Sequence, residues 1–260
     1  MKKYQLDLAL DHNPLATKVV DLINTNTEIK TLWRVVGVTA QRMSITDHGF
    51  THFQIVAKNA LQIFSLLIEN KVIPGIVRNY KLSVDHAELV VVLASLLHDM
   101  GMSIHRKGHE EFSLFITNNL LRELLDFMPI EERTVVISET LHAIISHRSD
   151  GQPLTMEAGI VRVADALDMS KGRSRLPYEP SKLDIHTVSA LAIDEVIIHA
   201  GKSYPVQIDI SMNHTAGLFQ VDELLKKKVM GSSIEQHLDI KVYVDKGEGK
   251  QLFKDFYQKR

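Results

Sequence analysis

The segment AELVVVLASLLHD, residues 87–99, is apolar on nearly every side of a helix and ends in a histidine and an aspartate. A helix without a polar face packs at the centre of a bundle rather than at its surface. Its last two residues, His98 and Asp99, would then be buried, and a buried carboxylate is costly unless a partner or a metal compensates it. The segment therefore predicts a helical core with a polar centre at one end.

The sequence on both sides of this segment is helical up to about Lys182. Apolar residues return at steps of three and four, which predicts helices over residues 14–29, 31–43, 51–70, 85–99, 109–127, 131–147 and 155–170. After a loop at 173–180, short strand-like runs follow at 195–200, 205–212 and 238–244, with an amphipathic segment at 221–230. We expect a mainly α protein, with an all-α domain over residues 1–182 and a small α+β domain over residues 183–260.

Composition excludes several classes of protein. Apolar residues make up 45% and charged residues 24%, which is typical of a globular chain, and the net charge of −2 argues against binding of double-stranded nucleic acid. There is no cysteine, so a metal would be held by nitrogen and oxygen ligands. The N-terminus does not resemble a signal peptide, and the apolar stretch Leu89–Leu97 is far shorter than the roughly 20 residues that cross a bilayer. We expect a cytoplasmic protein that does not enter a membrane.

Two further polar residues face the predicted core. His52 lies one turn before Val56 and shares the apolar stripe that continues along that helix. Asp165 follows Val161 at a spacing of four, so it also points inward. Three helices thus bring imidazoles and carboxylates to the interior, and a divalent cation would stabilise the buried carboxylates.

This ordered set resembles the HD-domain metal-dependent phosphohydrolase superfamily, whose signature is His, then His-Asp, then Asp on separate helices. The resemblance extends over residues 45–170 and includes "THFQIVAKNAL", "LASLLHDMG" and "EAGIVRVADALD". It implies that a first metal is bound by His52, His98, Asp99 and Asp165, with Asp99 able to bridge to a second ion. We accordingly take His98 and Asp99 as the catalytic residues.

Two more histidines match the second-metal positions of HD proteins. His109 in "GHEEFS" and His147 in "ISHRSDG" occupy them, which suggests two ions of Mn, Fe, Ni, Co, Zn or Mg. The alternative is a buried, hydrogen-bonded His147 and an exposed His109. The chain resembles HD-GYP phosphodiesterases only in part, because it lacks the Gly-Tyr-Pro stretch and has Met102 where those enzymes have lysine.

Other residues are candidates for supporting roles. His142 is a candidate to contact a metal ligand, and Asp168 could orient a ligand or a water, or equally act as a local cap. His48 could be a ligand, but its place beside Asp47 and Gly49 favours a turn residue. Substrate phosphate would need cationic donors, and the loops after the predicted ligands supply Arg106, Arg148, Lys171, Arg173 and Arg175. Alternatively, any one of these side chains is simply solvated.

We expect a metal-dependent phosphohydrolase, either a phosphomonoesterase or a phosphodiesterase, that acts on a small phosphorylated substrate such as a nucleotide. Two alternatives stay open: a mixed-valence diiron oxygenase built on the same ligands, and a regulatory protein that binds a nucleotide without turnover. The α+β domain would serve dimerisation or regulation and take no direct part in the chemistry, and its open strand edges predict a homodimer.

Overall fold

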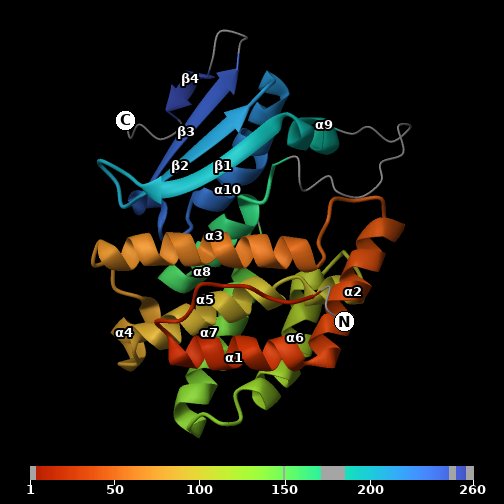
Figure 1. Ribbon diagram of the computed structural model, residues 1–260, viewed down its shortest axis with the longest axis vertical. Helices are drawn as coiled ribbons and strands as arrows, with labels where there is room; N and C mark the ends of the chain where they lie inside the picture. Colours follow the sequence, from red (N-terminus) through yellow and green to blue (C-terminus); the bar gives the residue numbers. More distant parts are fainter. Residues whose placement is uncertain (1–3, 149, 171–184, 246–249, 256–260) are drawn as a thin grey trace.

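In the computed structural model, the described residues are 4–148, 150–170, 185–245 and 250–255, and they form a helical part beside a small sheet (Figure 1). The helical part consists of α1 (Pro14–Thr25), α2 (Thr27–Arg42), α3 (Phe50–Glu69), α4 (Gly75–Tyr80), α5 (Val84–Leu97), the 3-10 helix η1 (Met100–Ser103), α6 (His109–Leu124), α7 (Ile130–Ser146) and α8 (Met156–Ala166). The C-terminal part consists of α9 (Ile185–Leu191), β1 (Ile193–Ala200), β2 (Val206–Met212), η4 (Thr215–Gly217), η5 (Gln220–Leu225), α10 (Lys226–Val229), η6 (Glu235–His237), β3 (Leu238–Asp245) and β4 (Lys250–Asp255). The predicted fold class, mainly α with a small α+β part, is confirmed.

Helix α5 is the centre of the helical part. Every residue from 87 to 102 is buried, and α5 contacts α1, α3, α4, α7 and α8. The Trp33 indole of α2 donates a hydrogen bond to the Leu96 carbonyl, 3.0 Å away, in the last turn of α5. The C-terminal end of α5 is therefore fixed from several sides, and this is where His98 and Asp99 follow.

Two local features of the helical part differ from the sequence prediction. The first two helices are separated at Asn26 rather than near residue 30, because the Asn26 side chain accepts from the Ile29 amide and caps α2. The short helix α4 was not predicted, since Pro74-Gly75 indicates a turn. The buried Glu157 carboxylate accepts from the amides of Gly75 and Ile76, both at 2.9 Å, and caps this helix from a distant part of the chain.

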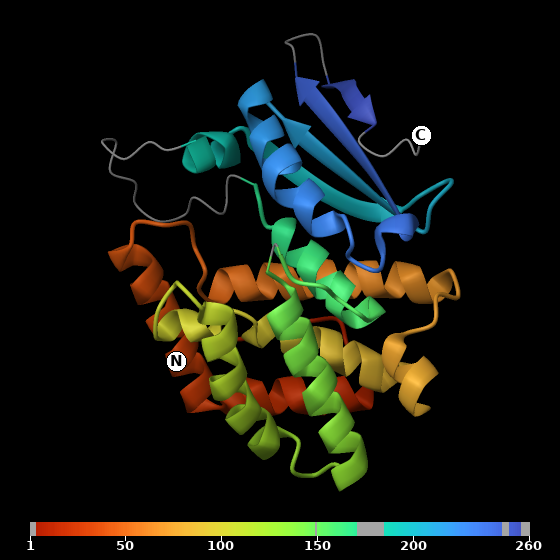
Figure 2. The ribbon, with the colours of Figure 1, turned by 180° about the vertical axis from the view of Figure 1, so that it is seen from behind.

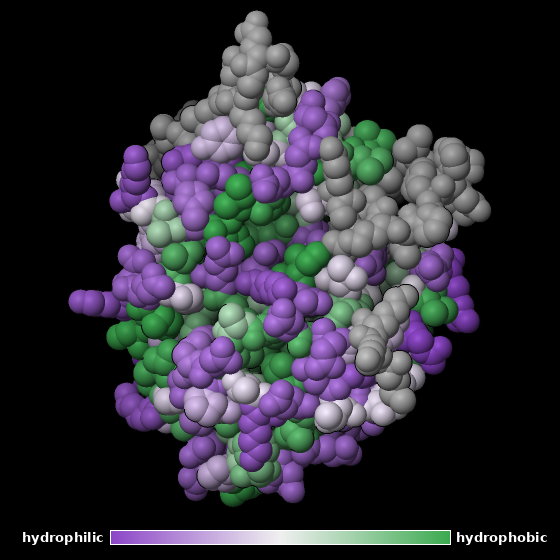
Figure 3. Space-filling model, viewed as in Figure 1, coloured by the Kyte–Doolittle hydropathy of each residue, from purple (hydrophilic) through white to green (hydrophobic). Residues whose placement is uncertain are grey.

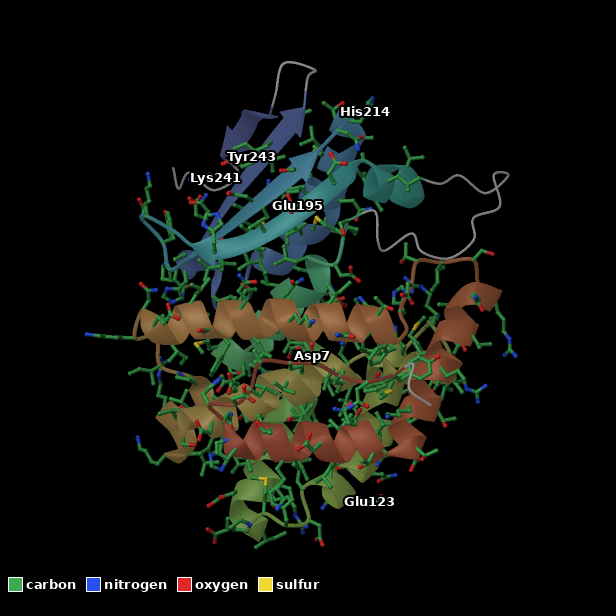
Figure 4. All side chains as sticks on the ribbon, in the orientation of Figure 1. Asp7, Glu123, Glu195, His214, Lys241 and Tyr243 are labelled. Carbon is green, nitrogen blue, oxygen red and sulfur yellow. The ribbon has the colours of Figure 1, made fainter. Side chains whose placement is uncertain are left out.

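The sheet has the strand order β1-β2-β3-β4, in which β2 and β3 are parallel and the outer pairs antiparallel. Strand β4 and helix α9 were not predicted, and the predicted amphipathic segment is the π-helical η5 followed by α10, which connects β2 to β3. The apolar face, with Ile208 and Ile240, belongs to the same hydrophobic cluster as the helices. Figure 4 shows Glu195, Lys241 and Tyr243 on the sheet side turned to the viewer, whereas α10 lies behind the sheet.

The surface is mixed in polarity. On the face shown in Figure 3, hydrophilic residues are interspersed with hydrophobic ones, as is usual for a globular protein. Among the helices in the described ranges, none combines the length and the apolar character needed to cross a bilayer.

Candidate metal centre

The ends of five helices deliver the candidate ligands to one place. His98 is the residue that caps the C-terminus of α5, and Asp99 follows it. His52 lies in the first turn of α3, and His109 is the first residue of α6. His147 caps the C-terminus of α7, and Asp165 lies near the end of α8. All except His109 are buried.

The inner cluster consists of His52, His98 and Asp165. The Nε2 atoms of the two histidines lie 3.2 Å apart, and Asp165 Oδ1 lies 3.3 Å from His52 Nε2 and 3.8 Å from His98 Nε2. These three groups offer ligand atoms that are all within 4.8 Å of one another, which suits a single cation.

The outer cluster consists of His109, Glu110 and His147, which could also hold a metal ion. Asp99 lies between the clusters and divides its two oxygens between them. Its Oδ2 lies 3.6 Å from His98 Nε2 and 3.9 Å from His52 Nε2, whereas its Oδ1 lies 3.0 Å from His109 Nε2 and 3.6 Å from His147 Nε2. One carboxylate is thus placed to serve both clusters.

The hydrogen bonds of the imidazoles point their ligand atoms inward. The Nδ1 atoms of His98, His109 and His147 lie 3.0, 2.7 and 2.6 Å from backbone carbonyls of Ser95, Arg106 and Ile144, to which they can only donate. His52 Nδ1 lies 2.7 Å from Asp168 Oδ2. A neutral imidazole carries one N–H, so in its neutral form each of these histidines offers its Nε2 lone pair to the centre, as in metal-ligating histidines.

Glycine at position 101 allows the outer cluster to approach Asp99. A Cβ atom there would lie 2.0 Å from the His109 carbonyl oxygen and 2.5 Å from the Ser113 nitrogen. The Gly101 amide instead donates to Ser113 Oγ at 2.8 Å. The first turn of α6 therefore packs directly against η1, which places His109 against Asp99.

Burial and charge shift the pKa values of the two clusters in different ways. Burial lowers the pKa of His98 to about 3, so His98 is neutral at physiological pH. Burial also works against protonation of His109, but its hydrogen bond to Asp99 and the charges of Asp99 and Glu110 raise its pKa to about 8. For Asp99, burial opposes ionisation but the surrounding imidazoles hold the pKa well below its ordinary value.

The donor set fits a divalent cation. Asp99, Asp165 and Asp168 are 5% exposed or less, and Lys228 is paired with Asp165. Burial opposes ionisation of Asp165, but Lys228 and His52 keep its pKa well below the ordinary value. The carboxylates of Asp99 and Asp165 and the inward-facing imidazole lone pairs are the hard and borderline ligands that divalent metals use, while Asp168 faces His52 Nδ1.

Sequence reasoning missed two residues of the site. Glu110 directly follows His109, and its position in the first turn of the same helix was an available signal. Lys228 reaches Asp165 from the C-terminal part, 63 residues further along the chain, and no local pattern indicates that contact. We expect the C-terminal part to take no direct part in the chemistry, and Lys228 is a side chain of that part that contacts a candidate ligand.

The three supporting histidine and aspartate candidates lie in different surroundings. Asp168 contacts His52, and the ring of His48 lies 5.6 Å from the ring of His52, with its Nδ1 2.6 Å from the Thr46 carbonyl. His142 instead accepts from the Leu154 amide at 3.0 Å and belongs to neither cluster.

The basic candidates are also placed differently from one another. Arg148 forms ion pairs with Glu111 at 2.7 Å and Asp150 at 2.6 Å. Arg106 is exposed, and its backbone carbonyl accepts a hydrogen bond from His109 Nδ1. Lys171, Arg173 and Arg175 lie outside the described residues.

Comparison with known proteins defines the class. Residues 50–170, the span that contains both clusters and Asp168, match the family model for the HD domain. The chain is also 35% identical over 230 residues to "Uncharacterized protein MJ1020" of Methanocaldococcus jannaschii, a match that covers 88% of this chain and 89% of that relative. The chain belongs to the HD-domain superfamily, whose members are generally metal-dependent phosphohydrolases.

Proposed function

We propose that this protein is a divalent-metal-dependent phosphohydrolase with a binuclear centre, acting on a phosphate ester of a nucleotide or a similar small molecule. The observation that carries the proposal is the position of Asp99, whose two oxygens face two separate sets of imidazole Nε2 atoms. A carboxylate shared in this way is suited to hold two cations at once.

The roles of the residues follow from their contacts. His52, His98 and Asp165 would hold one ion, and His109 and His147 the other, with Asp99 between them and Glu110 as a further donor. The ions, when bound, supply an activated water and stabilise charge on phosphate oxygens. Asp168 keeps the His52 ring in its orientation through Nδ1, and the carbonyls of Ser95, Arg106 and Ile144 do the same for the other three imidazoles.

A small anionic substrate is favoured over a polymer. The net charge of −2 argues against binding of a long polyanion, which requires an extended positive surface. Arg106 is available at the loop beside the outer cluster, whereas Arg148 is already engaged by two carboxylates. The site thus combines local cationic donors with an overall charge close to neutral.

The test is phosphate release from a panel of phosphomonoesters, nucleotides and cyclic dinucleotides, assayed without oxygen in the presence of Mn²⁺, Fe²⁺, Co²⁺, Ni²⁺, Zn²⁺ or Mg²⁺. We expect anaerobic turnover of a nucleotide or related ester and weak activity at most on cyclic dinucleotides. Product formed only in air, with oxygen consumed, would identify the diiron oxygenase instead. Nucleotide binding without turnover under every condition would identify a regulatory binding protein.

We also propose that the chain forms a homodimer through its C-terminal part. The edge strands of the sheet are β1 and β4. Strand β1 packs against α3, where Gln62 donates to the Ile198 carbonyl, so β4 is the edge that we expect to pair, and Ile197 on β1 adds an apolar side chain that is 43% exposed. Unpaired strand edges favour association with a second copy. Light scattering should give twice the chain mass, and Ile197→Lys should shift the protein toward the monomer; a monomeric wild-type protein would contradict the proposal.

A further inference from the structure

Lys228 is a cation that the C-terminal part delivers to the inner cluster. It belongs to the run Lys226-Lys227-Lys228 of α10, but its side chain is 17% exposed, whereas that of Lys227 is 58% exposed. Lys227 forms a surface ion pair with Glu223, one turn earlier, at 2.6 Å. Lys228 instead turns inward, and its ammonium group pairs with Oδ2 of Asp165.

Contacts on both sides of Lys228 fix this arrangement. Figure 2 shows α10 next to α8, the helix that carries Asp165. The Arg162 guanidinium of α8 donates to the Lys227 carbonyl at 3.0 Å, and Ser233 Oγ donates to the Thr155 carbonyl at 2.7 Å. Gly159 is required for the close approach, because a Cβ atom there would lie 1.8 Å from the Ser232 carbonyl oxygen.

The two oxygens of Asp165 have different partners. Oδ1 faces the Nε2 atoms of His52 and His98, whereas Oδ2 faces Lys228. The ammonium group therefore leaves the ligand-facing oxygen free. It has three N–H donors, of which the Asp165 pair uses one, and its partial exposure leaves it accessible to a bound anion.

We propose that Lys228 binds the phosphate group of the substrate, so that the C-terminal part completes the active site. This inference rests on the proposed function, because it assigns a substrate contact at the same centre. A phosphate held at the inner cluster would be adjacent to the ammonium, which shares a carboxylate with that cluster. Lys228 is less exposed than Arg106. Arg148 forms ion pairs with both Glu111 and Asp150, whereas Lys228 forms its ion pair with Asp165.

Binding of inorganic phosphate to the metal-loaded full-length protein tests the inference without relying on turnover. Lys228→Met should weaken phosphate binding by about tenfold or more in calorimetry, since hydrogen bonds between charged groups are worth that much. Lys227→Met removes the same charge from the same helix and should leave the affinity unchanged. Lys228→Arg should restore most of it, and elemental analysis should give equal metal content in all four proteins.

A second measurement uses the wild-type protein and so does not depend on the folding of a variant. Inorganic phosphate should slow the acetylation of Lys228 in the metal-loaded protein, followed by mass spectrometry, and leave the rate at Lys227 unchanged. Unchanged acetylation of Lys228, or wild-type phosphate affinity in Lys228→Met, would overturn the inference. Loss of phosphate binding only in proportion to lost metal would overturn it as well, because Lys228 would then act solely on Asp165.

The hydrolase proposal and the assignment of Lys228 can fail independently of each other. If the wild-type protein hydrolyses no ester but its phosphate binding depends on Lys228, the hydrolase proposal fails while the assignment of Lys228 holds.

Discussion

The inner and outer clusters each consist of two imidazoles and one carboxylate, but they differ in burial and charge state. The side chains of His52 and His98 in the inner cluster are fully buried, whereas the His109 side chain in the outer cluster is 16% exposed. Burial lowers the pKa of His98 to about 3, while Asp99 and Glu110 outweigh burial and raise the pKa of His109 to about 8. The local environment thus keeps His98 neutral, so its lone pair is ready to bind a metal, whereas His109 must lose a proton before it can bind one.

This difference suggests a division of labour between the clusters. A buried set of neutral donors beside Asp165 retains an ion, whereas a more exposed set with a protonated imidazole exchanges one more readily. Asp99 is the group that both share, so it should matter most. A change at Asp99 should therefore have a larger effect than a change that touches the inner cluster alone, and a change at the rim of the outer cluster should have the smallest effect.

Asp99→Ala should have the largest effect, because it removes a ligand from both clusters at once. We expect turnover of the ester that the phosphate-release panel identifies to fall by about a thousandfold or more, on the scale of losing a preorganised electrostatic group. Elemental analysis measures the loss of bound metal, and steady-state kinetics measures the loss of turnover. Asp99→Asn is the matched control for shape, and it should lose activity too; a variant that kept most of its turnover would place the chemistry elsewhere.

Asp168→Asn should lower the metal affinity of the inner cluster and leave that of the outer cluster unchanged. The change removes the charged acceptor of His52 Nδ1 but leaves every proposed ligand in place. Loss of such a partner typically lowers metal affinity by about 10- to 100-fold. Metal titration should show this for one ion only, and equal weakening of both ions would contradict the separation into an inner and an outer cluster.

The stability of the metal-free protein should depend on pH in opposite ways through the two clusters. His98 has a folded pKa of about 3, below its ordinary value of 6.5, so the unfolded chain binds more protons and the free energy of unfolding falls as pH drops below about 6.5. His109 has a folded pKa of about 8, so its stabilisation is fully present below 6.5 and is lost as pH rises through 8.

Denaturant unfolding between pH 5 and pH 9 measures both slopes. His98→Gln should flatten the decline on the acid side, and His109→Gln should flatten the decline between pH 6.5 and 8. The two variants serve as controls for each other, because each replaces one imidazole with an uncharged amide. Identical pH profiles for both would show that the clusters do not differ in the way their pKa values indicate.

The sequence predicted the parts of the centre that depend on helix periodicity. His52 and Asp165 share apolar stripes with Val56 and Val161, and both side chains are buried as that pattern requires. The position of Lys228 could not be predicted in this way, because it depends on how α10 packs against α8.

The same limit applies to parts of the fold. Helix α4 follows a Pro-Gly pair that favours a turn, and it is capped by Glu157, about 80 residues further along the chain. The π-helical start of the segment before α10 likewise departs from the regular helical period that the sequence pattern assumes. Local propensity describes each segment alone, whereas these features depend on distant partners.

The smallest effect is expected at the rim of the outer cluster, where Arg106 and Arg148 differ in their contacts. Arg148 is held by Glu111 and Asp150, so a substrate phosphate would have to compete with two carboxylates for it. Arg148→Ala should therefore raise the KM by less than about fivefold, because exposed ion pairs contribute at most about 1 kcal/mol and 1.4 kcal/mol is a factor of about ten. Arg106→Ala should raise the KM more, with kcat unchanged in both variants. The comparison needs one substrate and one metal under identical conditions, and a larger KM effect for Arg148 than for Arg106 would show that the substrate displaces its two acidic partners.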